Sequence, residues 1–207
     1  IFYNSKCIWL VSSNEIYIVN FEVIDNAIPL DQQNIIEDTL FGTPRTFNWY
    51  YTPDVTHTKG VQKRPAFIHD FVLPEGRQNS KHLGLLTPIM KHSGVDQSLN
   101  IIKARSILQL PLNTKFRGRS IDMPHVDLHF KHTVYLYYVL DADGDTIFYN
   151  NDNKISHKIK PKKGRLVIFD GSILHTAKQP TKGVRCIINI DLRSGIRSDT
   201  GGFFKAI

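Results

Sequence analysis

Five short runs of β-branched and aromatic residues follow residue 130, and their spacing constrains the fold more than any other feature of the chain. Turn-forming pairs such as Asp143-Gly144 and Lys182-Gly183 separate the runs. Strands at such short, regular intervals argue against alternating βα units and favour a sandwich or barrel, with a jelly-roll as the natural candidate. The runs cover residues 133–140, 145–149, 155–159, 165–170 and 184–192.

The first half of the chain predicts fewer and less regular elements. Runs rich in β-branched and aromatic residues predict strands, N-cap and stop residues bound a helix, and Pro and Gly mark a loop. We therefore expect a mainly β fold with a few helices. Strands are expected at 15–24, 64–73 and 100–110, helices from Asp31 to Gly42 and within 82–92, and an irregular loop at 43–63.

The chain length and composition are those of one ordinary globular domain. The 207 residues are 41% hydrophobic and 22% charged, so we expect a single domain over 1–207 with residues 1–14 as an extension. Cys7 and Cys186 lie too far apart in sequence to suggest a disulfide framework, which favours a reducing cytoplasm. No apolar run approaches the roughly 18 residues of a membrane span, so no membrane association is expected.

The net charge of +7 suits an anionic partner such as nucleic acid or an acidic protein. Many soluble proteins are equally basic without such a partner. Charge alone therefore leaves a nucleic-acid substrate open without favouring it.

One His-x-Asp arrangement, His125-Val126-Asp127, has the spacing of a metal site. Residues i and i+2 of a strand project from the same face, so the imidazole and the carboxylate can address one ion. Two His and one carboxylate on one octahedral face suit non-haem Fe(II) oxygenases. By itself the pair is weak, since two solvated polar residues at a strand end would look the same.

His175 and Arg185 strengthen the metal hypothesis. His175 lies fifty residues after His125, past four candidate strands, where a jelly-roll can return a late strand beside an early one. Arg185 opens an alternating strand, and an inward-facing guanidinium is costly unless an anion meets it. A carboxylate can accept two parallel hydrogen bonds from it. Alternatively, Arg185 pairs with an internal Asp of the protein or points outward.

Several strings resemble the prolyl 4-hydroxylase-like branch of the 2-oxoglutarate/Fe(II) dioxygenases over about residues 100–192. The order His-x-Asp, His, Arg is that of the branch. Tyr137 to Asp141 is similar to the strand after its first two ligands. Residues 144–148 resemble its Gly-Gly-Glu-Thr-x-Phe string, with Asp145 where the family has Glu. Residues 161–170 resemble its lead-in to the distal His.

The resemblance implies a double-stranded β-helix (jelly-roll or cupin-like) whose catalytic core is residues 100–192. It implies that His125, Asp127 and His175 bind Fe(II) and that Arg185 binds the distal carboxylate of 2-oxoglutarate. Further positions would contact or line the same co-substrate pocket: Tyr138, Leu136, Thr146, Ala177 and Asn189.

The implied activity is oxidative decarboxylation of 2-oxoglutarate to succinate and CO2, coupled to hydroxylation of a C–H bond. The expected cofactor is Fe(II), with 2-oxoglutarate and O2 as co-substrates and ascorbate to keep the iron reduced. The expected substrate is a protein or peptide residue such as proline, or else a small molecule. The resemblance to small phage and bacterial oxygenases places the chain in a bacterial or phage-infected cytoplasm; the oligomeric state is open.

Other polar residues receive weaker interpretations. His129 and His132 flank the first motif and could be mistaken for ligands, but we do not expect either to bind the metal, and the remaining histidines have no partner pattern. Lys115, Arg117 and Arg119 precede His125 on a predicted loop, where they are candidates for contacting an anionic or polypeptide substrate.

Two alternatives to a protein hydroxylase remain at this stage. A nucleic-acid demethylase of the superfamily would carry a second Arg six residues after the first, whereas this chain has Asp191 there. A non-catalytic jelly-roll, a binding or virion protein, would keep the strands without a reason to hold the four polar residues in order.

Overall fold

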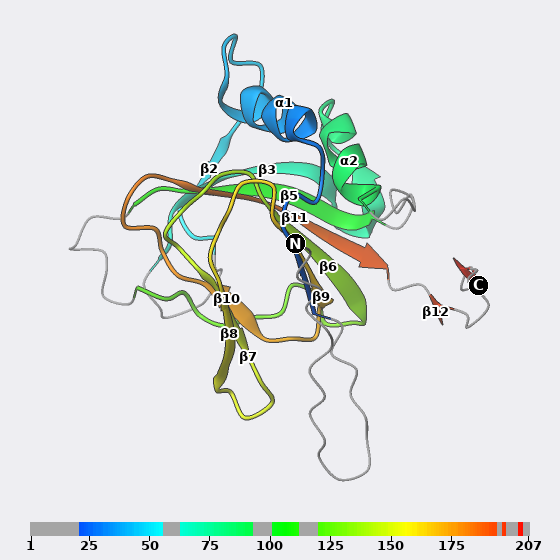
Figure 1. Cartoon of the computed structure of the whole chain (residues 1–207), viewed down its shortest axis with the longest axis vertical. Coiled ribbons are helices and arrows are strands. Elements are labelled where there is room, and N and C mark those ends of the chain that lie inside the picture. Colours follow the sequence, from blue (N-terminus) through cyan, green and yellow to red (C-terminus); the bar gives the residue numbers. More distant parts are fainter. Residues whose placement is uncertain are drawn as a thin grey trace.

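The computed structural model describes residues 21–55, 63–92, 101–111 and 120–193, together with two short strands near the C-terminus. Two antiparallel sheets face each other, and two helices cover the outer face of the larger one (Figure 1). The helices are α1 (Leu30–Phe41) and α2 (Thr87–Met90), with 3-10 turns at Pro74–Gly76 and Leu83–Leu86. The strands are β1 (Glu22–Ile24), β2 (Tyr50–Thr52), β3 (Ala66–Leu73), β4 (Arg77–Gln78), β5 (Ile101–Gln109), β6 (His132–Tyr138), β7 (Thr146–Tyr149), β8 (Ile155–Ile159), β9 (Leu166–Asp170), β10 (His175–Ala177), β11 (Arg185–Arg193), β12 (Ile196–Arg197) and β13 (Phe203–Phe204).

The strand order is that of a double-stranded β-helix. The large sheet runs β1-β9-β6-β11-β5-β3-β2, with β4 beside β3, and the small sheet runs β10-β7-β8. Neighbours far apart in sequence, such as β5 and β11, pair antiparallel across the middle of the large sheet. The fold class expected from the strand spacing is therefore confirmed.

Strand β11 divides its side chains between two hydrophobic clusters because successive residues face opposite sides of a sheet. Cys186, Ile188 and Ile190 point to the helix side, where they pack with Ile36 of α1 and its neighbours. Ile187 points between the two sheets and joins a second cluster with residues of β6, β7 and β9. The inner face of β11 thus lines the interior of the barrel, where its polar residues meet.

Helix α1 begins at Leu30, so its N-cap is Pro29 and not the expected Asp31. Pro29 makes no side-chain capping bond, whereas Asp31 lies in the first turn, where a negative charge stabilises the helix dipole. Ile36 and Leu40 are buried, whereas Ile35 is half exposed. Gly42 follows the helix end, and its N–H donates to the Asp38 carbonyl.

Other differences from the expected elements involve short segments. The loop expected at 43–63 contains β2, and residues 56–62 within it lie outside the described part. Only residues 22–24 of the strand expected at 15–24 are a described strand. The helix expected within 82–92 is a 3-10 turn followed by a single α-helical turn. A three-residue strand, β10, forms at His175–Ala177, where no strand was expected.

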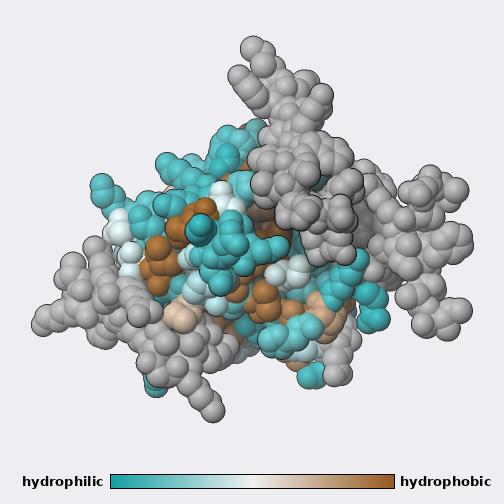
Figure 2. All heavy atoms as spheres, turned by 90° about the horizontal axis from the view of Figure 1, so that it is seen from below, coloured by the Kyte–Doolittle hydropathy of each residue, from teal (hydrophilic) through white to brown (hydrophobic). Residues whose placement is uncertain are grey.

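The face of the molecule in Figure 2 mixes hydrophilic and hydrophobic residues without one dominant apolar region. Phe130 and Ile155 are among the exposed large hydrophobic residues. Within the described residues, no helix is both long and apolar enough to cross a membrane.

Candidate metal centre and co-substrate pocket

His125 and His175 face each other across a reciprocal backbone pairing. The N–H of each residue donates to the carbonyl of the other, at 2.9 and 3.0 Å. His175 begins β10 and pairs with Phe148 of β7, while His125 forms this bridge outside any named strand. The two ring centroids consequently lie 4.8 Å apart. The turn after β9 therefore brings together residues that are fifty positions apart in sequence.

Asp127 completes a triangle with the two imidazoles. Its Oδ1 lies 3.8 Å from Nε2 of His125, and its Oδ2 lies 3.5 Å from Nε2 of His175. One ligand atom from each residue falls within 4.8 Å of the others. His175 and Asp127 are buried, with side chains 5% and 11% exposed, whereas His125 is 48% exposed. The triangle is thus open to solvent on the His125 side.

Both imidazoles are oriented by main-chain carbonyls. Nδ1–H of His125 donates to the Met123 carbonyl at 3.2 Å, and Nδ1–H of His175 donates to the Ile173 carbonyl at 2.9 Å. Because a carbonyl only accepts, each ring keeps its Nε2 lone pair for the common centre. Asn189 donates from Nδ2 to Oδ2 of Asp127 at 3.1 Å, which orients the carboxylate.

The charges in this triangle depend on one another. Burial alone would raise the pKa of Asp127, but the neighbouring His175 and His125 hold the pKa of that carboxyl well below its usual range. Burial alone would lower the pKa of His175, but its interaction with Asp127 raises the pKa above the ordinary value. Asp127 and His175 can therefore share a proton between them or bind a cation together.

A divalent iron fits these residues by donor chemistry. Two imidazole nitrogens and one carboxylate oxygen converge, and the orientation of both rings leaves a nitrogen lone pair for the ion. This donor set also leaves coordination positions that protein atoms do not fill.

Arg185 lies fully inside the barrel, only 2% exposed. Its Nε–H donates to the Gly144 carbonyl at 2.9 Å, and its terminal nitrogens donate to Oε1 of Gln109 at 2.9 Å and Oγ1 of Thr146 at 2.8 Å. None of these acceptors carries a charge. Within the described part of the chain, no carboxylate forms an ion pair with Arg185. A buried guanidinium without an adjacent anion is what a carboxylate-binding position requires.

The other expected pocket residues lie around Arg185 and Asp127. The Tyr138 hydroxyl donates to Oγ1 of Thr146 at 2.6 Å, so Thr146 accepts from both Tyr138 and Arg185. Burial, as the largest cause, raises the pKa of Tyr138, so this residue stays a neutral donor. Ala177 pairs with Thr146, and Leu136 is buried opposite Asn189.

A second polar cluster, unexpected from the sequence, lies on the far side of Asp127. Asp191 and His132 are both completely buried, and a ligand atom from each falls within 4.8 Å of a ligand atom of Asp127. Both oxygens of Asp191 and Nε2 of His132 lack a hydrogen-bond partner among the described residues. Lys103 is the nearest cation, 3.7 Å from Oδ2 of Asp191. Asn189 and Asp191 are two residues apart on β11 and therefore share its inner face. This spacing was the sequence feature that could have indicated the cluster.

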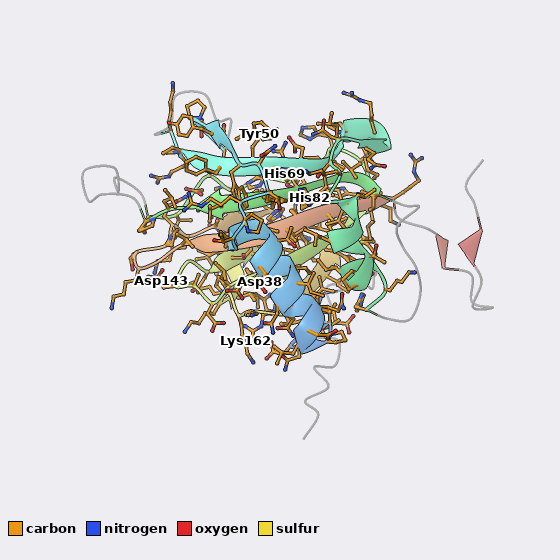
Figure 3. All side chains as sticks on the ribbon, turned by 90° about the horizontal axis from the view of Figure 1, so that it is seen from above. Asp38, Tyr50, His69, His82, Asp143 and Lys162 are labelled. Atoms are coloured by element: carbon orange, nitrogen blue, oxygen red, sulfur yellow. The ribbon has the colours of Figure 1, made fainter. Side chains whose placement is uncertain are left out.

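Other predicted positions lie apart from the centre or outside the described residues. Residues 112–119, which include Lys115, Arg117 and Arg119, are not described. His69 lies in the core under the helices, hydrogen-bonded to the Asn48 carbonyl and the Ser80 hydroxyl. Figure 3 shows His69 and His82 side by side, with ring centroids 6.2 Å apart.

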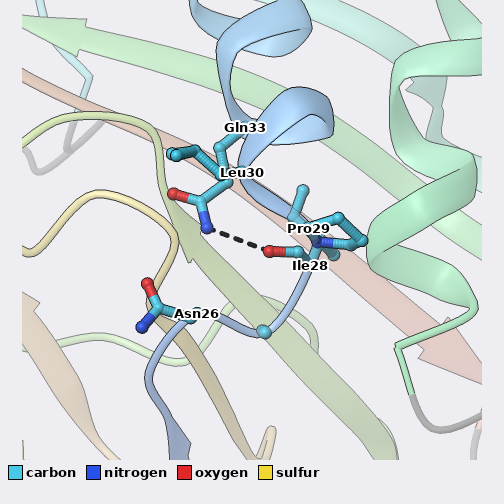
Figure 4. A pocket seen from close by; sticks show the side chains of 6 residues that line it. Asn26, Ile28, Pro29, Leu30 and Gln33 are labelled. Carbon is cyan, nitrogen blue, oxygen red and sulfur yellow. Dashed lines mark hydrogen bonds between the residues drawn. The ribbon is translucent and has the colours of Figure 1, made fainter.

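A surface pocket at the start of α1 is separate from this chemistry (Figure 4). Gln33 crosses it, donating from Nε2 to the Ile28 carbonyl. The pocket lies on the helix side of the large sheet, whereas the His-Asp-His triangle lies between the sheets. We therefore assign the chemistry to the barrel interior. The pocket is lined by Asn26, Ala27, Ile28, Pro29, Leu30 and Gln33.

Comparison with known proteins agrees with the geometry of the barrel interior. Residues 118–192 match the family model described as the 2OG-Fe(II) oxygenase superfamily, and the match spans all three members of the triangle and Arg185. The matched residues are similar to those of 2-oxoglutarate/Fe(II)-dependent oxygenases, and the match supports an oxidoreductase that uses Fe(II), 2-oxoglutarate and O2. It favours an enzyme over the alternative of a non-catalytic jelly-roll. No curated protein matches the chain.

Several solved structures share the fold of the chain. A prolyl hydroxylase from Trichoplax adhaerens, in complex with a hypoxia-inducible-factor peptide, is 14% identical with a TM-score of 0.57 and covers 83% of each chain. A prolyl-4-hydroxylase from Pseudomonas putida is 14% identical with a TM-score of 0.56, covering 85% of this chain and 94% of that one. The epimerase SnoN of nogalamycin biosynthesis is 9% identical with a TM-score of 0.59, covering 86% and 78%. These likenesses show the fold, which prolyl hydroxylases share with an epimerase.

Proposed function

We propose that the chain hydroxylates a C–H bond of a protein or peptide residue such as proline. His125, Asp127 and His175 hold the Fe(II), and Arg185 holds the carboxylate of 2-oxoglutarate that lies away from the metal. The overall reaction consumes 2-oxoglutarate, O2 and the substrate, and yields succinate, CO2 and the hydroxylated product.

The observation that carries this proposal is the pairing of two incomplete sites in one barrel. The triangle presents two imidazole lone pairs and a carboxylate to one point. Arg185, on β11 of the large sheet, presents a buried cation that no described carboxylate neutralises. A dianion with one end on the metal and the other on the guanidinium satisfies both sites at once.

Each residue then has a definite task. Fe(II) with bound 2-oxoglutarate supplies the capacity to activate O2 and oxidise a C–H bond. The carbonyl contacts of His125 and His175 fix which ring nitrogen faces the metal. Asn189 holds the carboxylate of Asp127, and Oγ1 of Thr146 accepts hydrogen bonds from both the Tyr138 hydroxyl and Arg185. The buried, water-poor setting of Arg185 strengthens its attraction for the co-substrate.

The choice of a polypeptide substrate rests on two supports. The two prolyl hydroxylases share the fold, and one of them was solved with a peptide. The His125 side of the triangle is solvent-exposed, which allows a segment of a larger molecule to approach. Asp191 stands where nucleic-acid demethylases have a second Arg, so the chain lacks that residue of a demethylase.

The metal and co-substrate roles are tested by anaerobic titration of the Fe(II)-loaded protein with 2-oxoglutarate, following the visible charge-transfer band of the chelate. The wild type is expected to give the band. His175→Ala is expected to abolish it, because the metal loses a buried ligand. Arg185→Ala is expected to need at least about a hundredfold more 2-oxoglutarate, because the distal carboxylate loses its charged partner. A folded wild type without a band would disprove the assigned roles.

The substrate is tested separately, with proline-containing peptides incubated aerobically with Fe(II), 2-oxoglutarate and ascorbate. Mass spectrometry is expected to find a gain of one oxygen on proline and one succinate formed per oxygen gained. Arg185→Ala is the matched control at the same 2-oxoglutarate concentration. Oxidation of other residues with proline untouched would keep the oxygenase reaction and exclude the prolyl substrate.

A further inference from the structure

A buried hydrogen-bond network behind Arg185 has no role in the reaction described so far. Its centre is Asp122, a carboxylate only 6% exposed. Nε of Arg64 donates to Oδ1 of Asp122 at 2.7 Å, with both side chains buried. Nε2 of Gln179 donates to the other oxygen, Oδ2, at 2.6 Å. The carboxylate therefore has a firm partner on each oxygen.

Gln109 connects this centre to Arg185. Its Nε2 donates to Oδ2 of Asp122 at 3.4 Å, and its Oε1 accepts from Arg185 at 2.9 Å. A carboxylate only accepts and a guanidinium only donates, so the two contacts together fix the direction of the amide. Reversing the amide would place an oxygen against Asp122 and an NH2 group against Arg185. Gln109 is thus held in the one orientation that lets it accept from the arginine.

The network also balances charge at this end of the barrel. Arg64 and Arg185 are two buried cations, and Asp122 is the carboxylate that connects to both, directly to Arg64 and through Gln109 to Arg185. The ion pair with Arg64 occupies Asp122, so the positive charge of Arg185 remains available to an incoming anion.

The main chain of Asp122 joins the network to the metal centre. Its N–H donates to the Ala177 carbonyl at 2.9 Å, and its carbonyl accepts from Oγ1 of Thr176 at 2.9 Å. Both partners belong to β10, which begins with His175. Asp122 is also three residues before His125. One residue therefore holds the Arg185 side chain through Gln109 and the two histidine segments through its backbone.

We propose that Gln109 and Asp122 are positioning residues that fix the Arg185 guanidinium for the distal carboxylate of 2-oxoglutarate. The inference rests on the function proposed for Arg185. Gln109 supplies a neutral acceptor, which aims the guanidinium without neutralising it. Asp122 sets the direction of the Gln109 amide, and its own charge is paired with Arg64.

The test compares three variants with the wild type by anaerobic 2-oxoglutarate titration of the Fe(II)-loaded protein. Gln109→Leu removes the acceptor at similar size, and about a tenfold rise in the 2-oxoglutarate dissociation constant is expected. Gln109→Glu places a carboxylate on Arg185 that competes with the co-substrate, and a larger rise is expected. Gln33→Leu is the matched control, a buried glutamine on α1 whose bond goes to the Ile28 carbonyl.

A second readout separates positioning from a general role in folding. The Fe(II) dissociation constant and the thermal midpoint are measured on the same four proteins. Positioning requires the two Gln109 variants to lose 2-oxoglutarate affinity while their Fe(II) affinity stays within about twofold of the wild type. Gln33→Leu is expected to lower the thermal midpoint alone.

Three outcomes would overturn the inference. Unchanged 2-oxoglutarate affinity in both Gln109 variants would show that Arg185 is positioned without this network. Parallel losses of Fe(II) and 2-oxoglutarate affinity would show a structural role only. A wild type without the chelate band would remove the proposed function of Arg185 and this inference together, whereas a normal wild type with unaffected variants removes the inference alone.

Discussion

The two ends of the inner face of β11 differ in how their polar groups are satisfied. At the Arg185 end, the guanidinium, Gln109 and Thr146 each have hydrogen-bond partners within the described chain. At the Asp191 end, roughly 20 Å along the strand, both carboxylate oxygens and Nε2 of His132 have none. Both ends are buried, so the contrast is one of hydrogen bonding and not of solvent access.

The two ends therefore differ in whether the protein alone satisfies their buried polar groups before a ligand binds. At the Arg185 end the guanidinium has its hydrogen-bond partners in the protein alone and lacks only an anion, so we expect its geometry to be present before any ligand binds. The Asp191 end contains more acceptors than donors, and Lys103 is its nearest cation. An excess of buried acceptors costs stability, which a cation bound at the neighbouring Asp127 would offset.

Two glycines are closely packed, one at each end of the inner face of β11. A Cβ on Gly144 would lie 2.5 Å from the Lys178 carbonyl and 3.1 Å from Cδ of Arg185, and a Cβ on Gly171 would overlap the imidazole of His132. Each change to Ala is expected to cost about 2–3 kcal/mol of unfolding free energy because the buried neighbours must shift. Urea denaturation of the metal-free proteins measures this cost.

Co-substrate binding distinguishes the two glycine variants. Gly144→Ala displaces Arg185 and is expected to weaken 2-oxoglutarate binding by about tenfold. Gly171→Ala disturbs His132 and is expected to leave 2-oxoglutarate binding within about twofold, in the same anaerobic titration. Equal losses in the two variants would mean that the ends of β11 are not independent.

The contrast between the two ends was only partly predictable from sequence. Strands β6 to β9 and β11 match their expected ranges to within two residues because their alternation is a local property. The three-residue strand β10 was missed because its existence depends on pairing with β7, which is a tertiary property. The inward alternation of Arg185 and Asn189 was read correctly for the same local reason.

The partners of those inward residues could not be predicted. Gln109 accepts from Arg185 across 76 positions of sequence, and Asp122 meets Arg64 across 58. Such contacts follow from the pairing of β5 with β11 and from the return of the chain to β10, and neither is encoded in a local pattern. A polar residue at an inward position of a barrel strand was the only available signal, and it applied equally to Lys103, Arg105 and Gln109.

The Asp191 end is expected to make the metal-free protein sensitive to pH. Burial first, then the negative charge of Asp127, raises the pKa of Asp191 to about 7, while Lys103 acts in the opposite direction. The unfolded carboxyl titrates near 3.8, so the folded state binds more protons between these values. This contribution to stability is therefore fully present below about pH 4 and is lost as the pH rises to about 7.

Asp191→Asn removes that dependence and keeps the size of the side chain. The variant is expected to gain on the wild type by up to a few kcal/mol between pH 4 and 8, at about 1.4 kcal/mol for each full pKa unit. Urea unfolding of both proteins in the presence of a chelator, at matched pH values, measures the difference. A constant difference across this range would mean that Lys103 keeps Asp191 ionised throughout.

Asp25 is a surface carboxylate that serves as a comparison for both buried ends, and its substitution has the smallest expected effect. Hydrogen bonds from Arg165, then from Lys162, lower the pKa of Asp25 to about 2 although burial opposes them. The side chain of Asp25 is 41% exposed, so solvent screens the interaction and Asp25→Asn is expected to cost less than about 1 kcal/mol at pH 7. The stabilisation is present above pH 4 and disappears as the pH falls through about 2, opposite in sign to Asp191. Chemical denaturation at pH 7 with and without 1 M NaCl checks this, because salt is expected to remove most of an exposed ion pair and little of a buried one. A loss at pH 7 as large as that of a buried-end variant would show that exposure does not explain the contrast.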